Sequence, residues 1–291
     1  MKLRARSAAV WLLLACGCAS VRREHAVSVG TAGAAWGRAM DALLLLAEET
    51  AVDADSARAL SEAQGLSRDD RRLVLEKHAG VEDQIADFER LRRHARLLAR
   101  YFEGLRQLAD GAADRAAGDA AARAMEEAST LGREISGSAF LSASERDLLS
   151  KSAGLLVRGV RERALSRELA SRAAAVAHEL LVQQTLLDAL RRHIRADAAS
   201  LRELGRQRDV SRPYLENRIP DPPIWIAQRR LYTLPSAAGD ILSDASDTAS
   251  RLRSAWAALS EGRLDGGAWS ALLADAESLA SWVRAVREAR R

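Results

Sequence analysis

Residues 169–204 read LASRAAAVAHELLVQQTLLDALRRHIRADAASLREL, and the spacing of apolar residues in this stretch decides the fold. Apolar side chains recur at alternating steps of four and three, the pattern of a helix that buries one seam against a neighbouring helix. The seam comprises Leu169, Ala173, Val176, Leu180, Gln183, Leu187, Leu190, Ile194, Asp197, Leu201 and Leu204. The polar residues Gln183 and Asp197 interrupt it, as residues that fix the register of paired helices often do.

A second seam with the same steps lies upstream. It comprises Gln84, Phe88, Leu91, Ala95, Leu98, Phe102, Leu105 and Ala109. Leu181 and Leu186 widen the 169–204 seam beyond two positions per heptad, which favours three or four packed helices over two. Two matched seams in one chain predict an all-α fold, an elongated antiparallel helical bundle with coiled-coil-like long helices.

The composition agrees with an all-α fold that has its own core. The chain has 291 residues, of which 48% are hydrophobic and 4% aromatic, and alanine and leucine dominate. A first helix is predicted from about residue 31 to 62. Ser142 and Glu145 form a capping box, and we expect the helix that begins there to continue to about Arg208.

The N-terminus has the features of a secretory signal peptide. Lys2, Arg4 and Arg6 form a positive region, and a short apolar region follows at residues 8–15. This apolar run is far shorter than the roughly 20 residues that span a bilayer. We therefore expect residues 1–15 to be removed and not to remain as a transmembrane anchor.

The end of this segment, Leu13-Leu14-Ala15-Cys16, resembles the lipobox of bacterial lipoproteins. The resemblance covers about the first twenty residues. It implies that Cys16 is joined to diacylglycerol and that cleavage occurs before it. Cys18 is the alternative lipidation site, although that register loses the leucine favoured three residues upstream. Neither cysteine precedes Asp, which implies an outer-membrane anchor with the body facing the periplasm.

These signals divide the chain into five predicted segments. Residues 1–15 are the signal peptide, and residues 16–30, which are polar and lack periodicity from residue 19, form a lipidated tether. Residues 31–212 form the long-helix bundle, and residues 213–235 form an elbow that contains all five prolines. Residues 236–291 form a C-terminal helical hairpin that packs on the bundle.

The charge and the cysteines exclude several classes of function. The net charge is +4, but removal of the signal peptide leaves +1, with arginine and glutamate interspersed. Nucleic acid is therefore not an expected partner, because phosphate-backbone binding needs a broad basic surface. Both cysteines lie near the N-terminus, so the body has no disulfide and no thiol nucleophile.

The tetrapeptides Leu91-Arg92-Arg93-His94 and Leu190-Arg191-Arg192-His193 repeat beside the two seams. If the helices align antiparallel, the clusters would converge on an anionic lipid headgroup or on acidic side chains of a partner. The alternative interpretation is two solvated, arginine-rich faces that repeat by chance.

No motif predicts catalysis, a metal site or a cofactor. The pentapeptide His178-Glu179-Leu180-Leu181-Val182 begins like a zinc-protease motif, but Val182 replaces the second histidine. Trp256, Trp269 and Trp282 are spaced by thirteen residues, which does not keep one helical face. This spacing favours core packing over a platform for sugar rings.

The sequence thus predicts a non-enzymatic envelope lipoprotein that is anchored by lipid and binds another envelope protein as a scaffold or adaptor. The alternative is a bundle that holds a lipid or other apolar ligand between its helices. An enzyme that acts on envelope material is the third possibility.

Overall fold

The computed structural model describes residues 2–110, 115–137, 141–153, 164–219, 221–233, 238–261, 263 and 267–289. These residues form helices and no strand, which confirms the predicted all-α class. The helices are α1 (Lys2–Glu62), α2 (Arg68–Lys77), α3 (Val81–Asp110), α4 (Arg115–Ile135), α5 (Ala143–Ala153), α6 (Ala164–Arg206), α7 (Arg212–Leu215), α8 (Pro222–Thr233), α9 (Ala238–Ser260) and α10 (Gly267–Ala289). A 3-10 turn (His78–Gly80) joins α2 to α3, and a π-helical turn (Gln207–Ser211) joins α6 to α7.

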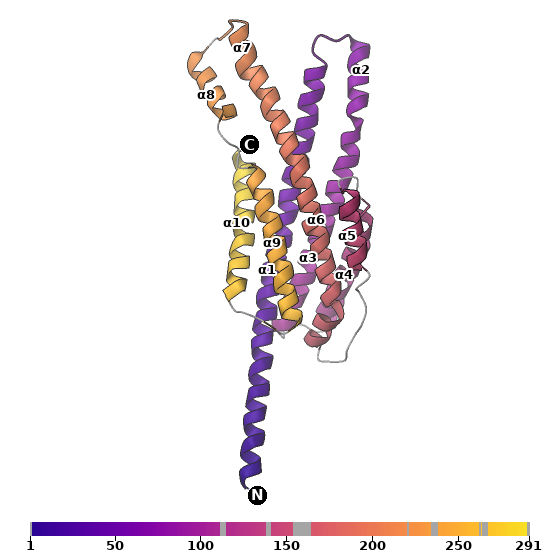
Figure 1. The fold of residues 1–291 in the computed structure, drawn as a ribbon, viewed down its shortest axis with the longest axis vertical. Coiled ribbons are helices and arrows are strands. Elements are labelled where there is room, and N and C mark those ends of the chain that lie inside the picture. Colours follow the sequence, from indigo (N-terminus) through magenta and orange to yellow (C-terminus); the bar gives the residue numbers. More distant parts are fainter. Residues whose placement is uncertain are drawn as a thin grey trace.

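The bundle is elongated, with α1, α3 and α6 at its centre (Figure 1). α3 runs antiparallel to α1, and α4 packs against α3. Arg58 of α1 donates a hydrogen bond to Ser200 of α6 at 3.2 Å and pairs with Asp197. The hairpin of α9 and α10 covers α1 and α6.

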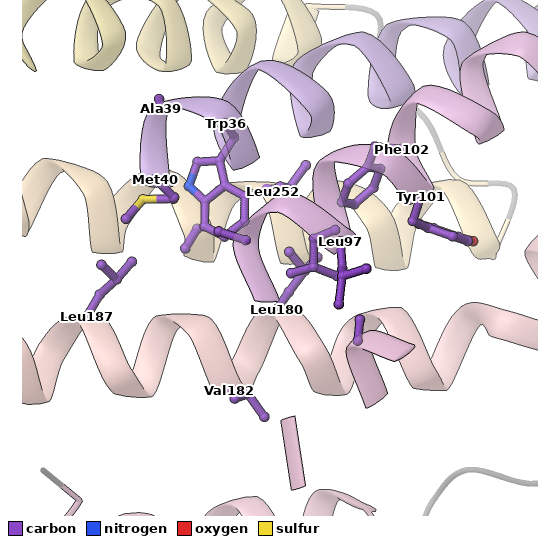
Figure 2. Close-up of a cluster of buried hydrophobic side chains, with 14 of the residues drawn as sticks. Trp36, Ala39, Met40, Leu97, Tyr101, Phe102, Leu180, Val182, Leu187 and Leu252 are labelled. Atoms are coloured by element: carbon purple, nitrogen blue, oxygen red, sulfur yellow. The ribbon is translucent and has the colours of Figure 1, made fainter. Parts of the chain in front are cut away.

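The core forms where α1, α3, α6 and α9 meet. Figure 2 shows Trp36 and Met40 of α1 lying close to Leu252 of α9 and facing Leu187 of α6. Around this cluster, the rings of Tyr101, Phe102 and Trp256 meet edge to face, with centroids 5.5–6.0 Å apart.

The predicted seams supply much of this core. Every residue of the 84–109 seam except Gln84 is buried. The 169–204 seam is buried at Leu169 and from Val176 to Ile194, and its last positions are half-buried. The steps of three and four therefore predicted correctly which faces of α3 and α6 turn inward.

Three glycines of α1 allow α3 to approach closely. A Cβ atom at Gly30 would lie 2.7 Å from the carbonyl oxygen of Phe102, and one at Gly37 would lie 2.8 Å from the carbonyl oxygen of Ala95. A Cβ atom at Gly33 would overlap the Phe102 ring. Glycine is the residue that permits such backbone approach, because it has no side chain.

The structure corrects the tether predicted for residues 16–30. α1 is helical throughout this segment, and Ala26 and Val29 are fully buried. The segment carries few large apolar residues, a composition that resembles that of a linker, and its last residue, Gly30, packs closely against α3. The helix predicted to begin at residue 31 therefore includes the whole segment.

The structure also corrects the single helix predicted from Ser142 to Arg208. The capping box is present, since the Ser142 N–H donates to Glu145 Oε2 at 2.8 Å. The helix that it opens, however, is α5, which ends at Ala153.

α5 and α6 run antiparallel to each other. Arg192 of α6 pairs with Glu145 near the start of α5, at 2.9 Å, and His178 of α6 lies beside Ser152 near the end of α5. The chain must therefore reverse between the two helices. The ten residues between them lie outside the described part of the chain.

Replacing Gly33 with alanine should lower the free energy of unfolding by about 1–3 kcal/mol, because the added methyl group overlaps the Phe102 ring. Gly118 of α4 is the matched control, since a Cβ atom there would lie 3.5 Å from Leu108, an ordinary contact. Gly118→Ala should raise stability by roughly 0.5–1 kcal/mol. Urea unfolding followed by circular dichroism measures both, and a Gly33→Ala variant as stable as the wild type would disprove the tight contact.

Candidate functional site

A buried polar cluster joins α3 to α6 in the interior. His94 and Glu179 are 0% and 1% exposed, and His94 Nε2 lies 2.9 Å from Glu179 Oε2. The side-chain amide of Gln183, also buried, donates to His94 Nδ1 at 2.6 Å. The imidazole therefore accepts at Nδ1 and donates from Nε2 to the carboxylate.

This cluster also depends on α4. A Cβ atom at Gly132 would overlap the Glu179 carboxyl group, so glycine at this position leaves room for this buried side chain. Both polar seam residues contact a facing helix, since Gln183 bonds to His94 and Asp197 pairs with Arg58. Such contacts specify register, because a shifted helix would leave a buried polar group without its partner.

His178 lies next to the cluster on α6 and is 5% exposed. Burial lowers the pKa of His178, the neighbouring His94 acts in the same direction, and the Glu179 carboxylate opposes both. The Ser152 hydroxyl lies 2.8 Å from both His178 Nδ1 and the carbonyl oxygen of Leu149.

The zinc-protease resemblance at His178 finds no support in the structure. Val182, where the motif needs its second histidine, is fully buried. Across the described part of the chain, no group of three or more His, Cys, Asp or Glu residues could hold a metal ion.

The two predicted arginine and histidine clusters do not come together. His94 is level with Gln183, whereas Leu190–His193 lies seven to ten residues farther along α6, about 10–15 Å at 1.5 Å per residue. The joint anion site predicted from the repeat is therefore not formed.

The arginines of these clusters take part in internal ion pairs. Arg92 reaches three carboxylates, with distances of 3.0 Å to Asp41, 3.2 Å to Glu48 and 2.7 Å to Glu89. Arg191 lies 3.9 Å from Asp188. Arg192 pairs with α5, as described above, and Arg93 and His193 are on the surface.

The tryptophans take separate roles. Trp256 is fully buried and donates from Nε1 to the carbonyl oxygen of Ala173 at 2.9 Å, which confirms core packing at this position. Trp282 packs against the core, and the side chain of Trp269 lies outside the described residues. Trp225 instead stacks on Tyr214, with ring centroids 5.7 Å apart.

A cleft of about 740 Å³ opens at the end of the bundle opposite the N-terminus, where α1 and α6 diverge (Figure 1). We call it the distal cleft. It lies between residues 53–64, at and just after the end of α1, and residues 201–216, which run from α6 through the π-helical turn to just past α7. Tyr232 of α8 contributes to its wall. Across its outer edge, Arg212 donates to the side-chain carbonyl of Gln64 at 3.3 Å.

The proline-rich segment builds one wall of the distal cleft. Its helix α8 folds back along α6, where Arg202 donates to the carbonyl oxygen of Tyr232 at 2.8 Å. The Tyr232 hydroxyl donates to Asp209 at 2.7 Å. Hydrogen bonds from Arg208 and Tyr232 hold the pKa of Asp209 below its usual value, so this carboxylate stays charged and anchors the wall.

Exposed apolar side chains gather on the helices at the end of the bundle that holds the distal cleft, and Leu60 and Leu215 line the cleft itself. Among the described residues, all large apolar side chains that are exposed, except Leu148, belong to residues 52–75 or 214–231. They are Val52, Leu60, Leu66, Leu73, Leu75, Tyr214, Leu215, Ile224, Ile226 and Leu231. The clustering was not apparent in the sequence, because the two stretches are about 140 residues apart.

The chain matches no protein-family model, no curated protein and no solved structure. Within the described residues, no helix has an apolar stretch long enough to cross a membrane.

Replacing His94 with leucine should lower the free energy of unfolding by about 3–5 kcal/mol, because it leaves a buried carboxylate without its partner. Replacing the whole cluster, as His94→Leu with Glu179→Met and Gln183→Leu, should recover most of that loss, since apolar residues of similar volume often substitute well for a buried pair. Chemical denaturation compares the two variants. A triple variant no more stable than His94→Leu would show that the three groups are not coupled.

The stability of the fold should depend on pH through His178. Its pKa in the folded state lies below 6.5, so below about pH 6.5 the unfolded chain binds more protons than the folded chain. The contribution of neutral His178 to the free energy of unfolding is therefore fully present above pH 6.5. It is lost as the pH falls through the pKa that His178 has in the folded state. Denaturation at pH 7.5, 6.0 and 5.0 should show a smaller decrease for His178→Asn than for the wild type, and parallel profiles would rule out this residue as the source.

Proposed function

We propose that this protein is a non-enzymatic adaptor of the bacterial envelope, anchored by lipid at Cys16, whose distal cleft binds an amphipathic helix of another envelope protein. The observation that carries this proposal is the clustering of exposed apolar side chains around the cleft. Exposed apolar side chains concentrated in one part of a soluble domain mark interaction sites. Leu60 and Leu215 are 72% and 80% exposed and border the cleft from opposite sides.

The chemistry of the cleft suits a helix as the occupant. Its lining combines leucines with a balanced set of polar groups, including Asp53, Arg208, Arg212 and Glu216. An amphipathic helix would bury its apolar side chains between the two walls and leave its polar face to these rim groups. The exposed leucines of the lining supply apolar area that a partner helix would bury, which supports binding as the role of this surface.

The anchor proposal rests on the lipobox resemblance at Leu13–Cys16. The N-terminus and the distal cleft lie at opposite ends of the elongated molecule (Figure 1). With acyl chains at the N-terminus, the cleft would point away from the membrane and into the periplasm. This arrangement places the apolar surface where a partner can reach it.

Substitution of the lipidated cysteine should release the protein from the membrane. Cys16→Ser should abolish labelling by radioactive palmitate and move the protein to the soluble fraction, whereas Cys18→Ser should leave both unchanged. If Cys18→Ser alone abolishes labelling, the acylated residue is Cys18. Absence of label in the wild type would refute the anchor.

Charge placed in the distal cleft should abolish partner binding. A photo-crosslinking residue at Gln64 in intact cells should yield a discrete crosslinked species that is lost when Leu60→Glu and Leu215→Glu are combined. The matched control is Leu148→Glu on α5, which makes the same change at a 50% exposed leucine far from the cleft. A crosslinked species that survives the double substitution would argue against the cleft as the binding site.

A further inference from the structure

A second concave surface, which we call the lateral groove, lies between α1, α3 and α4 and has a volume of about 650 Å³. Its floor is made of small or aliphatic residues, namely Leu97, Ala99, Gly104, Ala121 and Ala124. These residues make the floor apolar, and because most of them are small they leave room above it. The volume falls within the range of about 300–1,000 Å³ that is typical of small-molecule sites.

Three arginines from three different helices line the lateral groove. They are Arg38 of α1, Arg100 of α3 and Arg123 of α4, and all three are exposed. None of them makes a hydrogen bond or ion pair with the described residues.

The acidic residues of the groove are mostly paired with other cations. Asp41 is held by Arg92 and Arg96, with the Arg96 distance at 2.8 Å. Glu103 is held by Arg106 at 2.6 Å, and this hydrogen bond is the main cause of its lowered pKa, to which Arg38 contributes at longer range.

Glu127 is the remaining carboxylate of the groove lining, and it makes no ion pair with the described residues. Among the described residues, the groove thus holds three guanidinium groups and one carboxylate that make no ion pair. The groove has an excess of positive charge over an apolar floor.

We propose that the lateral groove binds an anionic amphiphile, with its headgroup on Arg38, Arg100 and Arg123 and its acyl chain along the alanine and leucine floor. Guanidinium groups bind carboxylate and phosphate oxygens through paired hydrogen bonds. A simple inorganic anion would use the arginines but not the floor, so the combination selects a headgroup with a tail. This site is independent of the distal cleft and of the proposed adaptor role.

The position of the groove agrees with this ligand class. Arg23 of α1 hydrogen-bonds the carbonyl groups of Ala109 and Asp110, so the C-terminal end of α3 lies where α1 leaves the bundle. The groove extends along α3 to Gln107, near that end. It therefore opens beside the part of the molecule that leads to the N-terminus.

The test is photo-labelling of the full-length protein in a non-ionic detergent, with photoreactive palmitate and photoreactive phosphatidylglycerol in separate arms and mass-spectrometric mapping of the labelled residues. Label should map to the groove in at least one arm, and the arm that labels identifies the ligand as a fatty acid or a phospholipid. Label in neither arm, or only outside the groove, would overturn the proposal.

Two sets of variants distinguish loss of the groove arginines from a general loss of positive charge. Combining Arg38→Gln, Arg100→Gln and Arg123→Gln should reduce groove labelling at least tenfold. Arg146→Gln, Arg230→Gln and Arg284→Gln remove the same charge from exposed positions on α5, α8 and α10 and should leave it unchanged. Equal loss in both sets would overturn the proposal.

A bulky side chain placed in the lateral groove provides a second test. Ala120 is exposed at the groove, so Ala120→Trp should block the tail without changing the charge or the core. Labelling should fall at least fivefold while the thermal melt stays that of the wild type. Undiminished groove labelling in this variant would show that the apolar floor does not hold the ligand.

Discussion

The close contact between α1 and α3 is the constraint on which the rest of the bundle depends. Gly30, Gly33 and Gly37 bring the backbones together, and the Phe102 ring lies directly over Gly33. Phe102 in turn packs edge to face on Trp256, which carries α9 against the bundle. The distance between α1 and α3 thus determines how far the side chains of α3 extend into the core. A side chain between them would displace the aromatic cluster and the helices that rest on it.

The buried polar cluster adds specificity to this packing. Apolar seams tolerate displacement by a whole heptad, because the same kind of side chain recurs every seven residues. The bonds from His94 to Glu179 and Gln183 have no equivalent one heptad away, so they define one register. Their cost is that ionisable groups lie in the interior, and the low pKa of His178 makes the same region sensitive to acid. The surfaces proposed for binding lie outside this region, at the distal end and between α1, α3 and α4.

Periodicity allowed the fold class and the inward faces of α3 and α6 to be predicted, because burial on one side of a helix imposes a repeat on the sequence. The prediction of a tether at residues 16–30 was wrong, because a helical segment rich in small residues has the same composition as a linker. The reversal between α5 and α6 was missed because an apolar pattern looks the same in one long helix and in two shorter ones. The arginines of the lateral groove come from three helices, at positions 38, 100 and 123, and no local spacing connects them. The repeated tetrapeptides suggested a joint site, but the register of α3 against α6 separates them.

The unbroken course of α1 has a mechanical consequence under the proposed lipid anchor at Cys16. A flexible tether would let the body tumble beside the membrane, whereas α1 passes without interruption from Lys2 into the core. From Cys16 to Leu60 this helix spans roughly 65 Å at 1.5 Å per residue. It would act as a stiff spacer that sets both the height of the distal cleft above the bilayer and the direction in which it faces. One residue inserted into α1 ahead of the bundle would rotate the body by about 100°, and seven would raise it by about 10 Å with nearly the same facing.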